Sequence, residues 1–370
     1  MSAFTVCKFG GSSVRDASAM RRCSQILEKY TDIKLVIISA TYNTTNELEE
    51  FAGLSLKNIS EALGLMGKTW KRHRDLALNL ECSPLCFRML DELEVEAEGL
   101  AKKMNSVGHY DKEIMDQIYS LGERLSSAIF ADYLNQYFQE QISYFDVRSI
   151  LHTDETFGRA KPDTAKIKSS VEQNLKPELL VSRIIVTQGF VGSSPDGKTT
   201  TLGREGSDYS AALLGEALDA SLIQIWTDVP GIATADPRKI SNARFIKELT
   251  FEEASVLARN GAKVLFPETL EPAKRIDCPV YVGSSLDLDT MGTLISCTQN
   301  ENRLSGMATE FNRITVSGIG VTSQEGKILS FLEEYSPKVV NSSEHELTME
   351  FEESHTIVIF RLLHAYLFEE

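Results

Sequence analysis

A lysine, two glycines and two hydroxyl side chains follow a short apolar run near the start of the chain. They are Lys8, Gly10, Gly11, Ser12 and Ser13. Glycines let backbone N–H groups approach oxygen anions closely because no Cβ atom stands in the way, and the lysine adds a compact positive charge. The segment therefore predicts a polyphosphate site, although such a turn is also a common corner between a strand and a helix.

A second polar segment, residues 199–210, leaves a predicted hairpin and opens a predicted helix. Its Arg204 can hold a carboxylate through two parallel hydrogen bonds. Gly206 and Ser207 can present backbone N–H groups at the start of the helix, where Asp208 can position a lysine or a metal ion. The alternative is a simple capped helix with Arg204 on the surface, and the pattern leaves both interpretations open.

Thr227 and Asp228 stand at the end of an apolar run and precede a Pro-Gly turn. Ligands of open α/β sheets bind beyond the carboxyl ends of the strands, so this pair could contact a ribose or a base. Asp228 could equally serve only to cap the turn. Arg238 and Lys263 add positive charge further along, although a lone lysine is usually just solvated.

Glu123 lies near the start of an apolar helical segment. It could pair with the ammonium group of a substrate. It could also be a first-turn glutamate that the helix dipole favours. The sequence alone does not separate these two interpretations.

Short β-branched runs alternate with helical patterns along the first 300 residues. The strand-like runs are 3–8, 34–39, 142–147, 183–187, 222–227 and 279–282, and the helical patterns are 16–30, 47–140, 208–219 and 250–260. This alternation indicates an α/β fold with a mainly parallel sheet covered on both faces. Asp196-Gly197, between two strand-like runs, predicts a hairpin.

The pattern changes after a polar segment, Gln299–Arg303, which is typical of a linker. Beyond it we expect strands at 313–319, 346–351 and 356–362 and a helix at 325–334. The sequence therefore predicts two domains, residues 1–298 and 304–370, of which the second is a small α+β unit.

Composition limits the classes of partner. The 370 residues carry a net charge of −15, which argues against nucleic acid as a main partner. Cys82 and Cys86 are the only closely spaced cysteines and no histidine cluster complements them, so the spacing does not favour zinc and reduced thiols are expected. We find neither a secretory leader nor an apolar run long enough for a membrane span, and we expect a cytoplasmic protein.

Eight segments, in the same order along residues 5–296, resemble those of aspartate kinases (aspartokinases) in the amino-acid kinase superfamily. They are 8–14, 39–46, 122–123, 157–160, 187–190, 203–208, 227–231 and 261–267. The resemblance implies a three-layer αβα amino-acid kinase fold with a mainly parallel central sheet. It also implies a small α+β C-terminal domain of the ACT type, which binds regulatory amino acids.

The resemblance implies ATP-dependent phosphorylation of the side-chain carboxylate of L-aspartate to 4-phospho-L-aspartate, the first step towards lysine, threonine and methionine. ATP and Mg²⁺ would be required, a homodimer is expected, and an amino acid could act as effector. The implied catalytic residues are Lys8 and Asp208, and the phosphate-binding residues are Gly10, Gly11 and Ser12. The implied aspartate-binding residues are Ser39, Thr45, Glu123, Phe190, Arg204 and Ser207, and the nucleotide-binding residues are Thr227, Asp228, Arg238 and Lys263.

The chain departs from the family pattern in three places. Glu205 stands where the family often has glycine, and we expect its side chain to point to solvent. Ala233 replaces an aromatic residue that many members carry near the adenine. The tail has room for one ACT-type module rather than two. A sister kinase acting on glutamate, acetylglutamate, a nucleoside monophosphate or carbamate, and a regulatory subunit that senses amino acids, are the alternatives.

Overall fold

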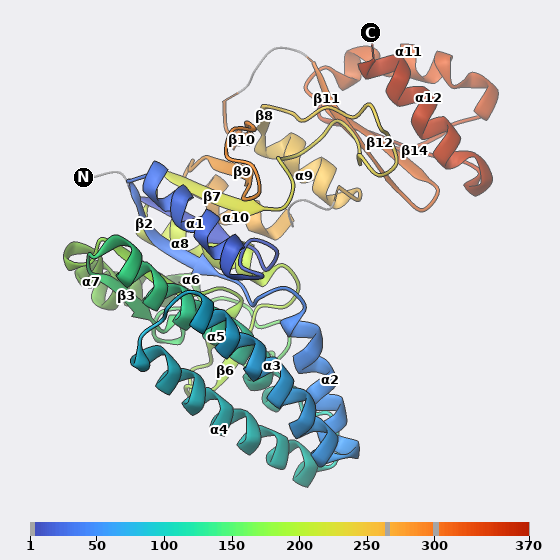
Figure 1. Ribbon diagram of the computed structural model, residues 1–370. Coiled ribbons are helices and arrows are strands. Elements are labelled where there is room, and N and C mark those ends of the chain that lie inside the picture. The colour runs from blue at the N-terminus through green and yellow to red at the C-terminus, as the bar shows by residue number, and fades with distance from the viewer. Residues whose placement is uncertain (1–3, 263–266, 299–302, 370) are drawn as a thin grey trace. The chain divides into compact units, whose positions relative to one another are not determined.

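A computed structural model describes residues 4–262, 267–298 and 303–369 (Figure 1). The chain forms two compact units. The first comprises Met1–Val229 with Ser285–Leu288, and the second comprises Pro230–Ser284 with Asp289–Glu370. These bounds differ from those of the domains predicted at 1–298 and 304–370, and that assignment of functional domains stays a prediction.

The first unit is built on a sheet of parallel strands, as the sequence predicts. The order is β3 (Ile142–Phe145), β4 (Ile184–Gln188), β2 (Ile33–Ile38), β1 (Thr5–Phe9) and β7 (Leu222–Thr227). The central strands are buried along their whole length, which explains their runs of Val and Ile. In this register Lys8 pairs with Ile37 of β2 and with Ile225 of β7.

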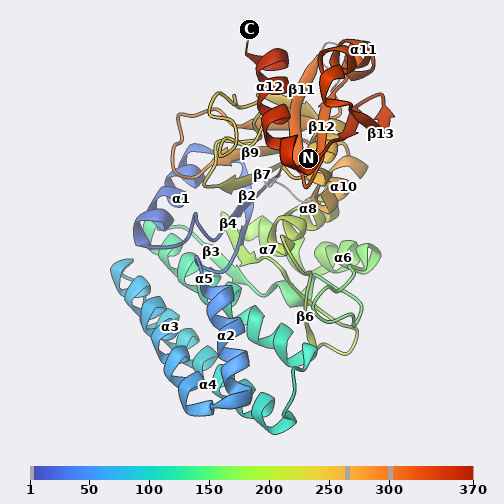
Figure 2. The same ribbon diagram turned by 90° about the vertical axis from the view of Figure 1, so that its right-hand side faces the viewer.

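Helices α2 (Thr44–Lys57), α3 (Ile59–Asn79), α4 (Pro84–Val107) and α5 (Lys112–Phe138) pack on one another beside this sheet (Figure 2). They confirm the helical character predicted for residues 47–140. Helix α2 begins at Thr44, three residues earlier than the predicted pattern, so the polar loop after β2 is shorter than expected. This helical bundle holds α5 against the sheet.

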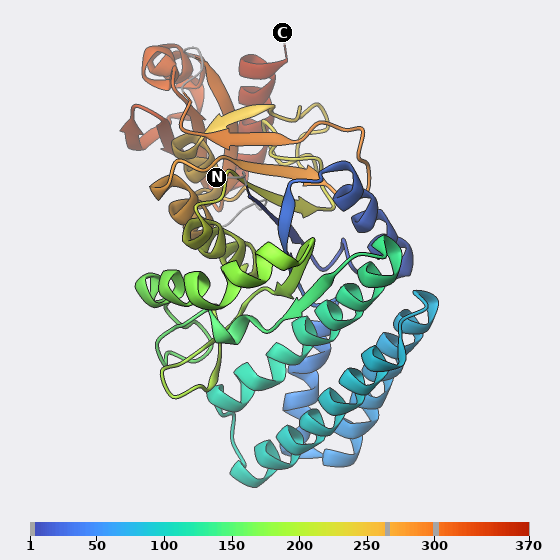
Figure 3. The same ribbon diagram turned by 90° about the vertical axis from the view of Figure 1, so that its left-hand side faces the viewer.

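The two faces of the sheet carry different helices. α5 packs on β3 and β4, and α1 (Ala17–Lys29) lies on the same side (Figure 3). α8 (Gly206–Leu218) packs on β1 and β7 from the other side, with α6 (Thr164–Ser170) against it. The side chain of Asp16 accepts a hydrogen bond from the Ala19 N–H at 2.8 Å and so caps the start of α1.

The predicted hairpin is present as β5 (Val191–Ser193) and β6 (Thr199–Thr201), which pair antiparallel. Gly197 in its turn has φ +74°, a conformation that glycine adopts freely. The remaining elements of this unit are the 3₁₀ helix Val147–Ser149, the π-helical turn Val171–Leu175 and α7 (Lys176–Val181).

The second unit contains two groups of paired strands. In one of them β10 (Thr293–Ser296) pairs parallel with β8 (Glu248–Thr250) and antiparallel with β9 (Val280–Ser284). Helices α9 (Phe251–Arg259) and α10 (Pro267–Arg275) belong to the same part of the chain. Thr250 and Glu253 form a reciprocal capping box at the start of α9, which explains why the predicted helix begins there.

The other sheet is four-stranded and antiparallel, in the order β11 (Leu304–Glu310), β12 (Arg313–Gly318), β14 (Glu346–Glu350) and β13 (Lys338–Ser343). Helix α11 (Val321–Phe331) packs on it, with short 3₁₀ helices at Glu333–Tyr335 and Glu353–His355. The first strand of this module is β11, and the strand predicted at residues 313–319 is the second one, β12. The shared core includes Ile314, Val316, Leu347, Met349 and Phe360.

The strand predicted at residues 356–362 is wrong, because this segment begins helix α12 (Thr356–Phe368). Its β-branched residues favour a strand by local propensity. The buried side chains of α12 are Thr356, Ile359, Phe360, Leu363 and His364, which is helical spacing. Packing on the sheet therefore overrides propensity here. Within the described residues, no helix is both long and apolar enough to cross a membrane.

Candidate active site

A cavity of about 560 Å³ opens in the first unit where β1, β2 and β4 end. Carboxyl ends of parallel strands meet at one edge of a sheet, and ligands of α/β folds bind at such edges. The cavity brings together nine of the residues predicted from the sequence: Lys8, Gly11, Ser39, Thr45, Glu123, Phe190, Arg204, Ser207 and Asp208.

Lys8 and Asp208 form an ion pair at this cavity. Lys8 is the penultimate residue of β1, and Asp208 lies in the first turn of α8. Lys8 is 7% exposed and Asp208 is 4% exposed. Because water is largely excluded from both charges, the pair holds the ammonium group in a fixed place.

The glycine-rich turn after β1 is held from both sides. The Gly10 N–H donates to the Trp226 carbonyl oxygen at 3.1 Å, and the Ser13 N–H donates to the Gly10 oxygen at 2.9 Å. A Cβ atom on Gly11 would lie 2.7 Å from the Ala40 oxygen, so this close approach requires glycine. The Gly10 amide is thus already engaged, and Gly11 is the glycine of the turn that faces the cavity.

Glu123 contributes a buried carboxylate from α5. Its exposed fraction is 4%, and burial raises its pKa to about 8, against the opposing effects of the Ala40 amide and the Lys8 charge. Within the described part of the chain, its Oε2 atom has no hydrogen-bond partner. A buried acceptor at a cavity wall is suited to a ligand that brings a hydrogen-bond donor, above all a cation.

Asp116 is a residue that the sequence reasoning missed. It is fully buried and accepts hydrogen bonds from the Gly158 N–H at 3.0 Å, the Thr201 N–H at 2.9 Å and the Thr201 hydroxyl at 2.7 Å. Gly158 and Thr201 line the cavity. Asp116, Tyr119 and Glu123 follow one another at helical spacing. This stripe of polar residues on an apolar helix is the sequence feature that could have identified Asp116.

His73 of α3 was also missed. It is 1% exposed, and its Nε2 atom lies 3.0 Å from the Thr41 hydroxyl, which in turn lies 2.6 Å from the Thr44 hydroxyl. The Nδ1 atom lies 2.8 Å from the Thr69 carbonyl oxygen. Because a carbonyl only accepts, Nδ1 carries the hydrogen and Nε2 accepts from Thr41. Burial lowers the pKa of His73 to about 4, so a neutral imidazole anchors the loop that lines the cavity.

Phe190 and Ser207 are fixed by their local backbone. Phe190 has φ +66°, and its N–H donates to the Ser210 hydroxyl at 2.9 Å. Its ring stands edge-on to Tyr119, with centroids 6.4 Å apart. Ser207 is buried in the first turn of α8. The turn between β4 and the hairpin thus forms part of the cavity wall.

Arg204 and Glu205 lie side by side at the mouth of the cavity. The Arg204 side chain is 79% exposed, and its Nε atom is 3.8 Å from the Glu205 Oε1 atom. Glu205 has φ +56°, the left-handed region that favours glycine. Its side chain is exposed, as expected, and its carboxylate also lies beside the Arg204 guanidinium. The guanidinium remains open to a carboxylate ligand.

The remaining predicted residues lie elsewhere. Gly10, Ser12, Thr227 and Asp228 are not part of the cavity wall. The pairing of Phe9 with Trp226 brings Thr227 level with the glycine-rich turn, and its hydroxyl donates to Asp228 at 3.1 Å. Arg238 belongs to the second unit, where it binds Asp236 through two hydrogen bonds of 2.9 Å. Lys263 is outside the described residues.

The chain is similar to known proteins in sequence and in fold. The chain is 41% identical over 307 residues to lysine-sensitive aspartokinase 3 of Escherichia coli (strain K12). That match covers 82% of this chain and 66% of the relative, so the chain spans just under two thirds of the relative's length.

Two solved structures of E. coli aspartokinase III are similar to this fold. The complex with aspartate and ADP, in the R-state, matches with a TM-score of 0.88 and 29% identity, over 99% of this chain and all of the other. The complex with lysine and aspartate, in the T-state, matches with a TM-score of 0.77 and 34% identity, over 98% of this chain and 83% of the other.

The family model of the amino acid kinases covers most of the chain. It matches residues 3–284, which include every strand that borders the cavity. The buried Lys8–Asp208 pair, the glycine-rich turn and the parallel sheet all lie within that match. The chain belongs to the amino acid kinase family.

Proposed function

We propose that the protein transfers the γ-phosphoryl group of ATP to the side-chain carboxylate of L-aspartate. The observation that carries the proposal is the charge pattern of the cavity. Arg204 offers a guanidinium, Glu123 a buried carboxylate and Lys8 a buried ammonium. L-aspartate has two carboxylates and one ammonium, so this arrangement is its complement. The similar E. coli structure in complex with aspartate and ADP supports the same assignment.

In this proposal Arg204 binds the α-carboxylate of aspartate through parallel hydrogen bonds, and Glu123 pairs with the α-ammonium. The side-chain carboxylate then points towards Lys8. Ser39, Thr45, Phe190 and Ser207 shape the pocket around it; all four lie on the cavity wall.

The reaction needs positioning and charge neutralisation rather than a base, because an aspartate side chain is already ionised near neutral pH. A carboxylate oxygen attacks the γ-phosphorus, the bond to the bridging oxygen breaks, and ADP leaves with the electron pair. Lys8 stabilises the charge on the transferring group, and Asp208 holds the Lys8 ammonium in place. The product is 4-phospho-L-aspartate.

The nucleotide enters as its magnesium complex, a substrate. The close approach of Gly11 to the Ala40 carbonyl leaves no room for a side chain, which fits a turn that receives phosphate oxygens. Gly11 and Ser12 are the proposed amide donors, since the Gly10 N–H is bonded to Trp226. Thr227 and Asp228 are proposed contacts of the ribose or base. The nucleotide roles of Arg238 and Lys263 stay predictions from the resemblance.

A substrate panel tests the proposal. ADP formation from MgATP is measured with L-aspartate, L-glutamate, N-acetyl-L-glutamate, uridine monophosphate and carbamate. We expect turnover with aspartate and at least a hundredfold lower kcat/KM with each other acceptor, because the extra methylene or missing ammonium misplaces the attacking oxygen. Preferred turnover of another acceptor would make the protein a sister kinase. Calorimetric binding of aspartate without turnover would make it a sensing subunit.

The antiparallel sheet of the second unit is the proposed regulatory module of the ACT type. Its support is the four-stranded arrangement of β11, β12, β14 and β13 with two helices, and the similar E. coli structure in complex with lysine and aspartate. An amino-acid effector and a homodimer are part of this proposal. Titration of the kinase reaction with lysine, threonine and methionine, together with sedimentation of the full chain, tests both.

A further inference from the structure

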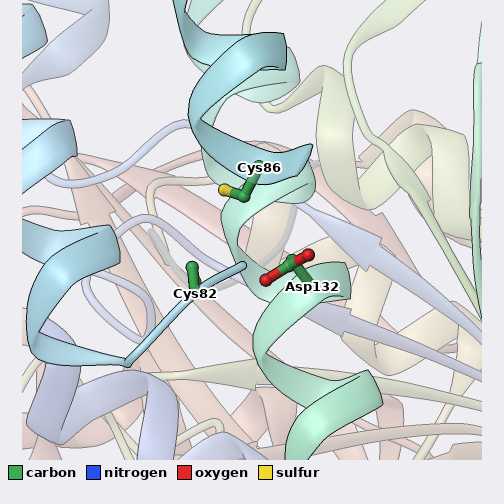
Figure 4. Close-up of side chains that lie close together, drawn as sticks. All are labelled: Cys82, Cys86 and Asp132. Carbon is green, nitrogen blue, oxygen red and sulfur yellow. The ribbon is translucent and has the colours of Figure 1, made fainter. Parts of the chain in front are cut away.

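Two cysteines and an aspartate meet in the helical bundle of the first unit, and none of them lines the cavity (Figure 4). Cys82 lies in the turn between α3 and α4, Cys86 in the first turn of α4, and Asp132 on α5. The two cysteine sulfur atoms and one carboxylate oxygen of Asp132 lie within 4.8 Å of one another. Three potential metal ligands from separate elements therefore share one place.

The surroundings of the cluster hold these ligands in position. Asp132 accepts from the Ser83 N–H at 2.7 Å, from the Ser83 hydroxyl at 2.5 Å and from the Gln136 side-chain amide at 3.1 Å. The Cys82 N–H donates to the Ala77 carbonyl oxygen at 3.0 Å, and Cys86 is fully buried. Carboxylates with such outer hydrogen bonds are oriented for ligation before a cation arrives.

The donor set selects the kind of ion. Thiolate sulfur favours soft or borderline cations, and a carboxylate oxygen is a frequent additional ligand of Zn²⁺. Bonds of about 2.0–2.3 Å place the ligand atoms of a tetrahedral zinc site roughly 3.3–3.8 Å apart. In the structure the three ligand atoms lie within 4.8 Å of one another, so a bound ion would draw them somewhat closer together. Water would complete a fourth position.

We propose that Cys82, Cys86 and Asp132 form a binding site for one thiophilic divalent cation of the Zn²⁺ class. The ion joins the α3–α4 turn and the start of α4 to α5, and so stabilises the bundle that carries Asp116 and Glu123. The cysteine spacing alone does not predict this site, because the third ligand comes from a distant helix that the fold brings alongside.

Cobalt titration of the full chain tests the site, because tetrahedral Co²⁺–thiolate centres absorb strongly in the near-ultraviolet and visible ranges. Protein washed with a chelator and kept reduced is titrated with Co²⁺ alone, and Zn²⁺ is then added. We expect one equivalent of Co²⁺ to bind with a sulfur-to-cobalt charge-transfer band, and Zn²⁺ to displace it. We also expect Zn²⁺ to raise the Tm.

Variants locate the binding. Cys82→Ser, at a half-buried position, and Asp132→Asn should each weaken Co²⁺ binding at least tenfold. Cys86→Ser should abolish the charge-transfer band. If this variant does not fold, because Cys86 is fully buried, Cys82→Ser serves as the test instead. Cys297→Ser, which alters an exposed thiol, is the matched control and should bind like the wild type. Absence of the band in the wild type, or an equal band in Cys82→Ser, would overturn the proposal. Neither the Co²⁺ charge-transfer band nor the Tm depends on kinase turnover.

Discussion

The ammonium group of Lys8 and the carboxylate of Asp208 form an ion pair that is almost completely removed from water. The two residues come from opposite ends of the first unit's sequence, one from β1 and one from α8. The pair joins the strand that precedes the glycine-rich turn to the helix that follows Arg204. It therefore fixes the proposed phosphoryl site relative to the proposed aspartate site.

Removal of either charge should abolish catalysis and destabilise the fold. Lys8→Met and Asp208→Asn each leave a buried charge or dipole without its partner, so the free energy of unfolding should fall by about 3–5 kcal/mol. The double variant should recover much of that stability yet stay inactive. Denaturant unfolding and turnover are measured on all three, with Lys57→Ala on the surface of α2 as control. Turnover in Lys8→Met close to the wild-type rate would rule out the assigned role of Lys8.

Arg204 should govern the affinity for aspartate rather than the rate of transfer. Loss of the proposed charge-assisted bidentate contact in Arg204→Ala should raise the KM for aspartate by about tenfold to a hundredfold, with little change in the KM for ATP. Initial rates over both substrate concentrations give the two constants. An unchanged KM for aspartate would place the α-carboxylate elsewhere.

Glu205→Gly should raise both the thermal stability of the protein and its apparent affinity for aspartate. Glycine adopts the observed φ of +56° without the strain of about 1–2 kcal/mol that a side chain suffers there. It also removes the carboxylate that lies 3.8 Å from Arg204 and competes with the ligand. We expect a higher Tm and a lower KM for aspartate. Glu205→Gln keeps the strain but removes the charge, so it should lower the KM without raising the Tm.

Glu123 should make stability and aspartate binding depend on pH. Burial raises its pKa from 4.5 to about 8, so its contribution to stability is complete below pH 4.5 and is lost as the pH rises to 8. In Glu123→Gln the free energy of unfolding should no longer show this fall with rising pH. Urea unfolding at pH 5 and pH 8 measures the difference. Because the ionised form is the one proposed to pair with the substrate ammonium, the KM for aspartate should fall between pH 6 and 8 in the wild type only. A parallel fall in the variant would contradict the assignment.

Asp116 should act as a positioning residue. In Asp116→Asn an amide N–H₂ faces the N–H donors of Gly158 and Thr201, which should destabilise the fold by about 1–3 kcal/mol. The KM for aspartate should rise about tenfold because the cavity wall shifts, whereas the KM for ATP should stay unchanged. Asp163→Asn is the matched control, since asparagine caps α6 equally well.

His73 should make the protein sensitive to acid. Its pKa is lowered from 6.5 to about 4, so its contribution to stability is present above pH 6.5 and is lost as the pH falls to 4. The expected loss is roughly 3 kcal/mol. His73→Phe should show a flatter pH dependence over this range, measured by urea unfolding. His109→Gln, at an exposed position, should behave like the wild type.

The sequence predicted the parallel sheet and most of the cavity because their signals are local. The β-branched runs mark buried strands, and the segments around Lys8 and Asp208 carry glycines and charges at short spacing. Their mutual contact follows from the register of β1 in the sheet and from the packing of α8 on it.

What the sequence did not predict depends on distant partners. Asp116 and His73 are ordinary helix residues until folding brings Thr201 and Thr41 to them. Residues 356–362 have strand propensity, but the spacing of Ile359, Phe360 and Leu363 suits a helix that packs on a sheet. No local pattern records these tertiary contacts.

The most direct test of the proposed activity is the trapping of the acyl phosphate with hydroxylamine. The full chain is incubated with L-aspartate, MgATP and hydroxylamine, beside Lys8→Met and reactions without ATP. We predict aspartyl hydroxamate in amounts that match ADP release, and none from the variant. ADP release without hydroxamate, or hydroxamate formation by Lys8→Met, would contradict the account.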